Sequence, residues 1–353
     1  MTPSRRIVTA LLATTALLGV RSAQAQTPAQ APAPAEKNLT VDHHLAAAKE
    51  AAGSDYTGTL ARICITPQTA PGGDRAPSNP PPRQAWFTEP AKIFDNLYFV
   101  GSRIHSSWAL TTSDGIILID TLYEYASEEL IPSGLKKLGL DPANVKYTLI
   151  SHAHGDHVGG AKMMQERYKS RIVMGDKDWA LVEKYTLAYP NGKPQRDIVA
   201  KDGDSITLGD TSVRLISTPG HTYDTYSFIF QVKDNGKPLT VAYNGGTAFN
   251  FINDVPHFDV YIASQQKMGK AAVDAGATVL LTNHSEFDNA GSKIRMMASR
   301  KEGEASPFEL GARAVTRYFR VTEECAQAAR LKLIQGVKPV VAVGGPAPVP
   351  AGQ

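Results

Sequence analysis

The stretch HAHGDH, from His152 to His157, contains three imidazoles and one carboxylate within six residues and follows an apolar segment directly. At the end of a β-strand, side chains two residues apart point to the same side, so His152 and His154 can bind one metal ion. Asp156 and His157 follow where the chain turns into a helix, and they can face a second metal ion nearby. Gly155 permits the turn. The stretch therefore predicts a metal centre at the end of a strand.

Two further histidines follow short strand-like segments. His221 comes after Ser217-Thr218-Pro219-Gly220, and His284 comes after Leu280-Leu281-Thr282-Asn283. Open α/β sheets place ligand groups at the carboxyl ends of their strands, so these side chains can converge with the first four. A single histidine in such a place is more often structural. Imidazole and carboxylate ligands suit zinc, and a catalytic zinc keeps one position open for water.

The composition is that of a folded protein with a sizeable core. Of the 353 residues, 42% are hydrophobic and 20% are charged, which excludes a disulfide-stapled mini-protein, a collagen and a wholly disordered chain. The formal charge of +3 includes Arg5, Arg6 and Arg21, which lie in the first 25 residues, where there is no acid. The rest of the chain is neutral, so nothing in its charge indicates binding to a nucleic acid.

The amino terminus resembles a removable export signal. Arg5 and Arg6 precede the uncharged apolar run 7–20, and Ala23-Gln24-Ala25 supplies the small residues of a cleavage site. The alternative is a membrane anchor, for which the apolar run is short. We therefore expect residues 1–25 to be a signal peptide, and the mature protein to be periplasmic or secreted without stable membrane insertion. In an oxidising compartment Cys64 and Cys325 can pair, and the alternative is two buried thiols.

The remainder divides into three predicted regions: a linker and N-terminal extension (26–84), a main domain (85–305), and a C-terminal helix and tail packed on that domain (306–353). Strands are expected at 92–100 and 108–120, each as a hairpin, and at 145–150, 212–217, 226–232, 240–243 and 278–281. Helices are expected at 38–53, 124–138, 158–168, 258–275 and 309–333. Two strand-rich halves with helices outside predict an α/β fold, specifically a four-layer αββα sandwich.

The motif and ligand order resemble a known family. The HxHxDH pattern is similar to that of the metallo-β-lactamase fold superfamily from about Trp86 to His284, and most like the third subclass of class B (zinc) β-lactamases. The resemblance implies two Zn²⁺ per chain. It implies that His152, His154 and His221 hold the first ion, and that Asp156, His157 and His284 hold the second. Asp156 would also act in catalysis, and Asp120, at a strand end, would support a ligand from behind.

Two departures from the family bear on the substrate. Thioesterases and lactonases of this fold carry a metal-bridging aspartate after a late strand, and Gly245 stands there in this chain. Its absence favours a β-lactamase arrangement. The third subclass holds the substrate carboxylate with two serines, which Gly246 and Ala248 replace, and Asp224 adds a negative charge. We therefore expect a weak hold on that carboxylate, with four basic residues as candidate replacements: Lys293, Arg295, Arg300 and Lys301.

The remaining site residues are assigned from their positions near the ligands. His105, Ser106, Ser107 and Trp108 form a loop that can line the pocket, and Tyr223 and Tyr226 can donate to an oxyanion. Core packing is the alternative for Trp108 and the tyrosines. Asn283 and Ser285 flank His284 and can orient it or face the pocket. His43, His44 and His257 are taken as non-ligands.

These features predict an exported dizinc hydrolase acting on a small-molecule substrate. A metal-bound hydroxide would open an amide, the β-lactam ring of antibiotics being the first expectation. The second is a zinc-dependent lactone, ester or thioester hydrolase of the same fold. A third, of another class, is a non-catalytic zinc-binding interaction protein that uses its C-terminal helix as a surface. The oligomeric state is left open.

Overall fold

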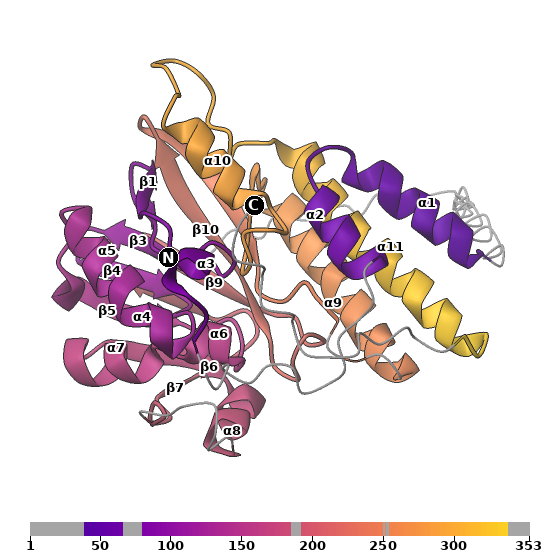
Figure 1. Cartoon of the computed structure of the whole chain (residues 1–353), viewed down its shortest axis with the longest axis horizontal. Helices are drawn as coiled ribbons and strands as arrows, with labels where there is room; N and C mark the ends of the chain where they lie inside the picture. The colour runs from indigo at the N-terminus through magenta and orange to yellow at the C-terminus, as the bar shows by residue number, and fades with distance from the viewer. Residues whose placement is uncertain (1–38, 66–79, 185–191, 250, 252–253, 338–353) are drawn as a thin grey trace, which may run out of the picture. The chain divides into compact units, whose positions relative to one another are not determined.

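Two β-sheets stack face to face, with helices on both outer sides, in the computed structural model shown in Figure 1. The structure describes residues 39–65, 80–184, 192–249, 251 and 254–337. The predicted signal peptide (1–25) and most of the predicted linker lie outside these residues. The described residues from Leu39 onward belong to one compact unit, and the predicted boundaries at 85 and 305 stay predictions.

The first sheet has seven strands in chain order, antiparallel from β1 to β4 and parallel from β4 to β7. These are β1 (Ala91–Phe94), β2 (Leu97–Phe99), β3 (Trp108–Thr112), β4 (Gly115–Ile119), β5 (Val145–Leu149), β6 (Arg171–Gly175) and β7 (Ile198–Ala200). The second sheet has the order β12-β11-β10-β9-β8, in which only β11 and β12 are parallel. These are β8 (Ser205–Leu208), β9 (Thr211–Ser217), β10 (Tyr226–Asp234), β11 (Lys237–Asn244) and β12 (Val279–Thr282).

Three apolar cores separate the four layers, because alternate residues of each strand face opposite sides. In β4, Ile117 and Ile119 enter the core between the sheets, whereas Ile116 and Leu118 face the helices of the first sheet. Those helices are α4 (Glu124–Leu130), α5 (Pro132–Lys137), α7 (Ala161–Tyr168) and α8 (Asp176–Lys184). The other helix layer covers the second sheet with α1 (Val41–Ala52), α9 (Val255–Asp274) and α11 (Ala312–Ile334). The predicted αββα sandwich is confirmed.

Two of the predicted helices are wrong in extent. The single helix expected at 124–138 is two helices, because Pro132 has no N–H to donate to the preceding turn. The helix expected at 158–168 begins instead at Ala161, and a separate turn, α6 (Gly155–Val158), lies inside the histidine motif. Helix α10 (Ala290–Met297), helix α8 and strands β6 to β8 were not predicted, because each is short and weakly patterned.

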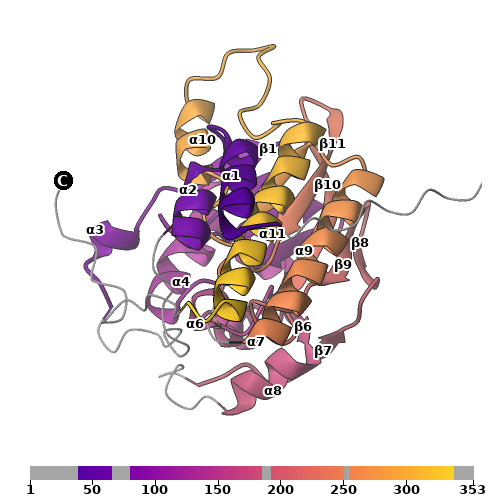
Figure 2. The ribbon, with the colours of Figure 1, turned by 90° about the vertical axis from the view of Figure 1, so that its right-hand side faces the viewer.

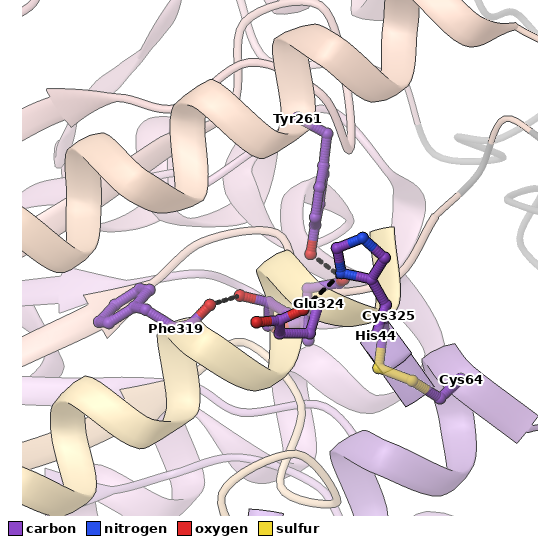
Figure 3. Close-up of a disulfide and its surroundings, with 8 residues drawn as sticks. His44, Cys64, Tyr261, Phe319, Glu324 and Cys325 are labelled. Carbon is purple, nitrogen blue, oxygen red and sulfur yellow. Dashed lines mark hydrogen bonds and ion pairs between the residues drawn. A yellow bond between two sulfur atoms is a disulfide. The ribbon is translucent and has the colours of Figure 1, made fainter. Parts of the chain in front are cut away.

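The N-terminal extension is tied to the C-terminal helix. Figure 2 shows α1 beside α11, which in turn lies along α9. Cys64, in the helical turn Ala61–Ile65, forms a disulfide with Cys325 of α11, so the predicted pairing is confirmed (Figure 3). Close to that bond, His44 Nδ1 lies 2.6 Å from Glu324 Oε2.

The same extension contacts the segment that follows His284. The hydroxyl of Thr59, in α2 (Thr57–Leu60), donates to the carbonyl of Phe287 at 2.6 Å. Gly58 lies so close to Glu286 that an added Cβ would be 2.1 Å from its carbonyl oxygen. Among the described residues, no helix combines the length and the apolar character needed to cross a bilayer.

The disulfide should contribute measurably to stability. It joins positions 261 residues apart, and such a link restricts the unfolded chain. We expect Cys64→Ser to lower the free energy of unfolding by about 2–4 kcal/mol, measured by urea unfolding without reductant. Cys64 is the cleaner site, because Cys325 is 1% exposed and a serine there also buries a hydroxyl.

The matched control is the Cys64→Ser, Cys325→Ser double variant. It should lose little more than the more damaging single variant, since all three lack the same bond. Wild-type protein unfolded in reductant should approach the Cys64→Ser value. An unchanged urea midpoint in the single variant would show that the bond restricts little in the unfolded chain.

Candidate metal centre

The candidate ligands come from loops and one short helix at the same edge of the two sheets. His152 and His154 follow β5, and Asp156 and His157 lie in α6. His221 lies between β9 and β10, and His284 follows β12. The structure thus brings together all six side chains that the sequence singled out, in overlapping groups whose donor atoms lie within 4.8 Å of one another.

The first cluster consists of three imidazoles. His221 Nε2 lies 3.1 Å from His152 Nε2 and 3.1 Å from His154 Nδ1. His152 Nδ1 is 2.9 Å from the carbonyl of Gly245, and His221 Nδ1 is 2.7 Å from the carbonyl of Ala248. Because a carbonyl only accepts, these Nδ1 atoms carry the protons and both Nε2 atoms present lone pairs to each other.

The second cluster is built around a carboxylate. Asp156 Oδ2 lies 3.1 Å from His284 Nε2 and 3.2 Å from His157 Nε2, and these two nitrogens are 3.2 Å apart. His157 Nδ1 donates to Asp120 Oδ2 at 3.0 Å. The ring of His157 is therefore held with its Nε2 toward Asp156.

Both clusters fit metal ions. With metal–nitrogen distances of about 2.0 Å, neighbouring ligands of a tetrahedral zinc lie about 3.3 Å apart, close to the separations seen here. Lone pairs that face each other in a buried place repel unless a cation lies between them. Nitrogen and carboxylate donors of this kind are those that zinc prefers. The ligand roles themselves remain predictions.

The electrostatics of the two clusters differ. Burial and neighbouring imidazoles lower the pKa of His152 well below its usual value, and burial lowers the pKa of His154 to about 4, which favours the neutral, ligating form. Burial also opposes a charge on His157, but Asp156 and Asp120 outweigh it and raise its pKa to about 10. A metal ion entering the second cluster must therefore displace a proton from His157.

Asp120 anchors the second cluster from behind. Its Oδ1 accepts the backbone N–H of Ser151 at 2.7 Å, and its Oδ2 accepts the hydroxyl of Tyr243 at 2.7 Å as well as His157. The residue has a φ of 60°, in the left-handed region, and is fully buried. Asp120 thus contacts the Nδ1 atom of His157, where a residue that orients this imidazole has to lie.

Asp178 supports the first cluster and was not identified from the sequence. Its Oδ2 accepts the N–H of Ala153, between two ligands, and the hydroxyl of Thr222, next to His221, each at 2.8 Å. One carboxylate therefore joins both loops of the cluster. Its partners lie 25 and 44 residues away in the chain, so no local pattern pointed to it. Burial, with a smaller contribution from Asp224, raises the pKa of Asp178 to about 7.

Three residues predicted to line the pocket are engaged elsewhere. Trp108 is fully buried in the core between the sheets, where it packs edge to face on Phe99. The hydroxyl of Tyr226 donates to the carbonyl of Ala200 at 2.9 Å, and that of Ser285 donates to the carbonyl of Arg103. These three predictions were wrong, because a hydroxyl that donates to a backbone carbonyl, or an indole enclosed in the core, is not offered to a substrate.

The other predicted neighbours keep a place near the ligands. Tyr223 is 67% exposed and stacks on His257, with ring centroids 5.7 Å apart. His105 Nε2 lies 3.4 Å from Asp156 Oδ2. Asn283, which was expected to orient His284, has its Nδ2 atom 3.4 Å from His157 Nε2 instead. Ser106 and Ser107 are buried, and the Ser107 hydroxyl donates to the carbonyl of Asp120.

The glycines at the end of β11 leave no space for side chains. A Cβ at Gly245 would lie 1.9 Å from the carbonyl oxygen of Tyr226, and a Cβ at Gly246 would lie 2.5 Å from the Cβ of His221. An aspartate at 245 or a serine at 246 therefore requires a displaced backbone or a displaced His221.

Several charges expected near the substrate also point elsewhere. Asp224 accepts the N–H of Lys177 at 3.0 Å, at the start of α8. Lys293 is 6% exposed, with its ammonium over the ring of Phe308, and Arg300 makes two hydrogen bonds to Asp234. Lys293 and Arg300 are thus ruled out as replacements for the missing serines.

Comparison with known proteins agrees with this fold. Residues 100–234 match the sequence profile of the metallo-beta-lactamase superfamily. BJP-1, a subclass B3 metallo-beta-lactamase of Bradyrhizobium japonicum, is 27% identical, with a TM-score of 0.59 over 78% of this chain and 100% of that one. FEZ-1, a metallo-beta-lactamase of Legionella gormanii, shares the fold at 24% identity, with a TM-score of 0.61 over 74% of this chain and 98% of that one.

The curated sequence relatives carry a different description. A hydroxyacylglutathione hydrolase of Rhodopseudomonas palustris (strain BisB5) is 33% identical over 82 residues, which are 23% of this chain and 28% of that protein. One of Francisella tularensis subsp. novicida is 40% identical over 83 residues, which are 24% of this chain and 28% of that protein. The chain thus spans less than a third of the length of these two relatives.

The raised pKa of Asp178 predicts a pH dependence of stability. Its carboxyl titrates near 3.8 when unfolded and about 7 when folded, so the folded state holds the proton more tightly and loses stability as the pH rises between these values. Relative to Asp178→Asn, which does not titrate, the metal-free wild type should lose up to roughly 4 kcal/mol from pH 4 to pH 7. Urea unfolding at a series of pH values measures this difference.

The control is Asp176→Asn, at an exposed carboxyl of the same helix. Its stability should run parallel to that of the wild type across the pH series. If the wild type and Asp178→Asn also ran parallel, Asp178 would be ionised throughout in the folded protein.

Proposed function

We infer the function of this chain from the metallo-beta-lactamase superfamily domain that it carries at residues 100–234. We propose a dizinc hydrolase that opens the amide of a β-lactam ring. The observation that carries the proposal is the combination of six converging donors with Gly245, where no bridging carboxylate fits. The family resemblance implies that thioesterases and lactonases of this fold use such a carboxylate.

The extent of the structural similarity supports the same choice. BJP-1 is matched over its whole length at 27% identity, whereas the hydroxyacylglutathione hydrolases match over short segments. A short shared segment indicates the type of domain only. The reaction has to be inferred from the residues around the candidate metal ligands.

The side chains provide the parts that amide hydrolysis needs. Zinc bound by these donors supplies an activated water and polarises the carbonyl of the substrate. Asp156, whose pKa the surrounding imidazoles hold well below its usual range despite burial, is an ionised base beside both clusters. Its carboxylate takes the proton of the attacking water and returns it to the departing nitrogen. Asp178 and Asp120 hold the side chains of the two clusters in place during this transfer.

The second candidate is a thioester hydrolase. It is favoured by one observation, the sequence similarity to hydroxyacylglutathione hydrolases around the domain. A lactone or ester substrate would use the same donors. The third reading, a zinc-binding protein without catalysis, is opposed by the three-histidine cluster, which leaves a tetrahedral metal one position for a reactant.

We further propose that the protein is exported and that its first 25 residues are removed. The disulfide supports this, because such bonds persist in oxidising compartments. Amino-terminal sequencing of the mature protein from the periplasm or medium should begin at Gln26. Retention of Arg5 and Arg6 in the mature chain would contradict the proposal.

A substrate screen tests the proposed reaction. Purified, zinc-loaded protein should hydrolyse penicillins or carbapenems, with a high KM because no serine stands at 246 or 248. Removal of the metal by a chelator should abolish the activity, and inhibitors that acylate a serine nucleophile should leave it unchanged. Turnover of an S-acyl glutathione or a lactone, with every β-lactam left intact, would reject the β-lactam proposal and retain the hydrolase.

The crowding at Gly246 predicts a specific loss of metal. In Gly246→Ser the added side chain must push His221, so zinc occupancy of the first cluster should fall while the second is retained. Metal analysis after dialysis measures the stoichiometry. Ala248→Ser is the matched control, since it adds the same hydroxyl at a position that already holds a Cβ. Equal occupancy in both variants would show that His221 tolerates the displacement.

A further inference from the structure

His105 lies within the second cluster although it belongs to no part of the histidine motif. It comes from the loop between β2 and β3 of the first sheet, whereas His221 and His284 follow strands of the second sheet. The sequence suggested only that it lines the pocket. Its ring is instead largely buried, 15% exposed at the side chain, and packs edge to face on His284 with centroids 4.9 Å apart.

The Nε2 atom of His105 points at the same oxygen as the other donors. It lies 3.4 Å from Asp156 Oδ2, the atom that His157 and His284 approach at 3.2 and 3.1 Å. The donor atoms of His105, Asp156 and His284 all lie within 4.8 Å of one another. Three imidazole nitrogens therefore approach one carboxylate oxygen, and His105 shares a group of close donors with Asp156 and His284.

The backbone holds His105 in this place. The Oγ atom of Ser102 accepts the N–H of His105 at 2.9 Å, which closes a tight turn. The N–H of Ser285 donates to the carbonyl of Ile104 at 2.7 Å, and that of Ser106 donates to Asn283 at 2.9 Å. His105 and His284 thus form an antiparallel bridge, so the two imidazoles are carried by one paired segment.

A hydrogen bond from His105 to Asp156 is the competing explanation. A good N–H···O bond has a donor–acceptor distance of about 2.7–3.2 Å, and a charged acceptor usually shortens it. The observed separation is longer, and it is close to the spacing of about 3.3 Å between neighbouring ligands of a tetrahedral zinc. Gly245 also supplies no side chain on this side, so no bridging carboxylate competes for the position.

We propose that His105 is a metal ligand and completes a four-donor second site with Asp156, His157 and His284. The proposal rests on the dizinc part of the proposed function and is independent of the substrate. Four protein ligands close a tetrahedral zinc site, whereas the first cluster has only three and keeps a position open. The two sites therefore have different roles. The first binds the reactant at its open position, and the second holds Asp156 in place.

The test is made on the full, disulfide-bonded chain loaded with Co²⁺. Proton NMR of the dicobalt protein shows the exchangeable ring N–H of each ligating histidine outside the ordinary spectral window. Wild type should show six such signals, one for each histidine of the two sites. Selective ¹⁵N labelling of histidine identifies them, so this measurement needs no variant.

Two variants then separate a ligand from a hydrogen-bond donor. In His105→Ala, one signal should disappear, and the affinity of the weaker zinc site, measured by competition with a chromophoric chelator, should fall at least about tenfold, the scale of loss seen even for supporting residues. His257→Ala removes another histidine, which stacks on Tyr223 and Phe251. It should change neither the signal count nor the affinity.

Two results would overturn the assignment. Five signals in wild type would leave His105 outside the metal's ligands. A loss of zinc affinity in His105→Ala with the signal count unchanged would make His105 a hydrogen-bond partner that positions Asp156. A failure of all β-lactam hydrolysis, by contrast, would concern the substrate only and would leave the signal count as the measure of this site.

Discussion

The central constraint on this molecule is the crowding of uncharged nitrogen lone pairs at a buried sheet edge. His152 and His221 face each other through unprotonated Nε2 atoms 3.1 Å apart, because backbone carbonyls hold the protons on their other ring nitrogens. Such an arrangement is unfavourable unless a cation occupies the space between the rings. The rest of the fold maintains this arrangement, so a metal ion bound there would add to the stability of the native state.

Two buried carboxylates hold the imidazoles in this arrangement by hydrogen bonds between the layers. Asp120, at the end of β4, ties His157 to Ser151 and to Tyr243 of the second sheet. Asp178, from a helix outside the first sheet, ties the loop of His152 to the loop of His221. Neither residue faces the reactant. Because each bonds to segments far apart in sequence, the clusters form only when the whole sandwich has closed.

The sequence predicted the parts of the site that are local in the chain. The HAHGDH motif and the strand ends before His221 and His284 were sufficient to name six donors and the αββα fold. Trp108 and Tyr226 were misplaced because a residue beside a ligand in sequence can point into the core, and alternation along a short strand does not settle which face is which. Asp178 was missed because it bonds to a backbone N–H and a hydroxyl, which leave no pattern.

Gly245 is a residue whose surroundings could not be predicted from the sequence. That it stands in the place of a bridging carboxylate stays a prediction, whereas the lack of room for any side chain is visible only in three dimensions, where the carbonyl of Tyr226 comes too close. The close approach of β10 to β11 at that point therefore has a chemical consequence. Among the described residues, Asp156 supplies the only carboxylate in the groups of candidate metal donors.

That single charge also explains why the imidazoles gather around Asp156 rather than spreading evenly. Its Oδ2 has nitrogen neighbours in His157, His284 and His105, on three different segments. A carboxylate held from three sides has little freedom to move, so Asp156 can exchange a proton only with a group that is brought to its fixed position.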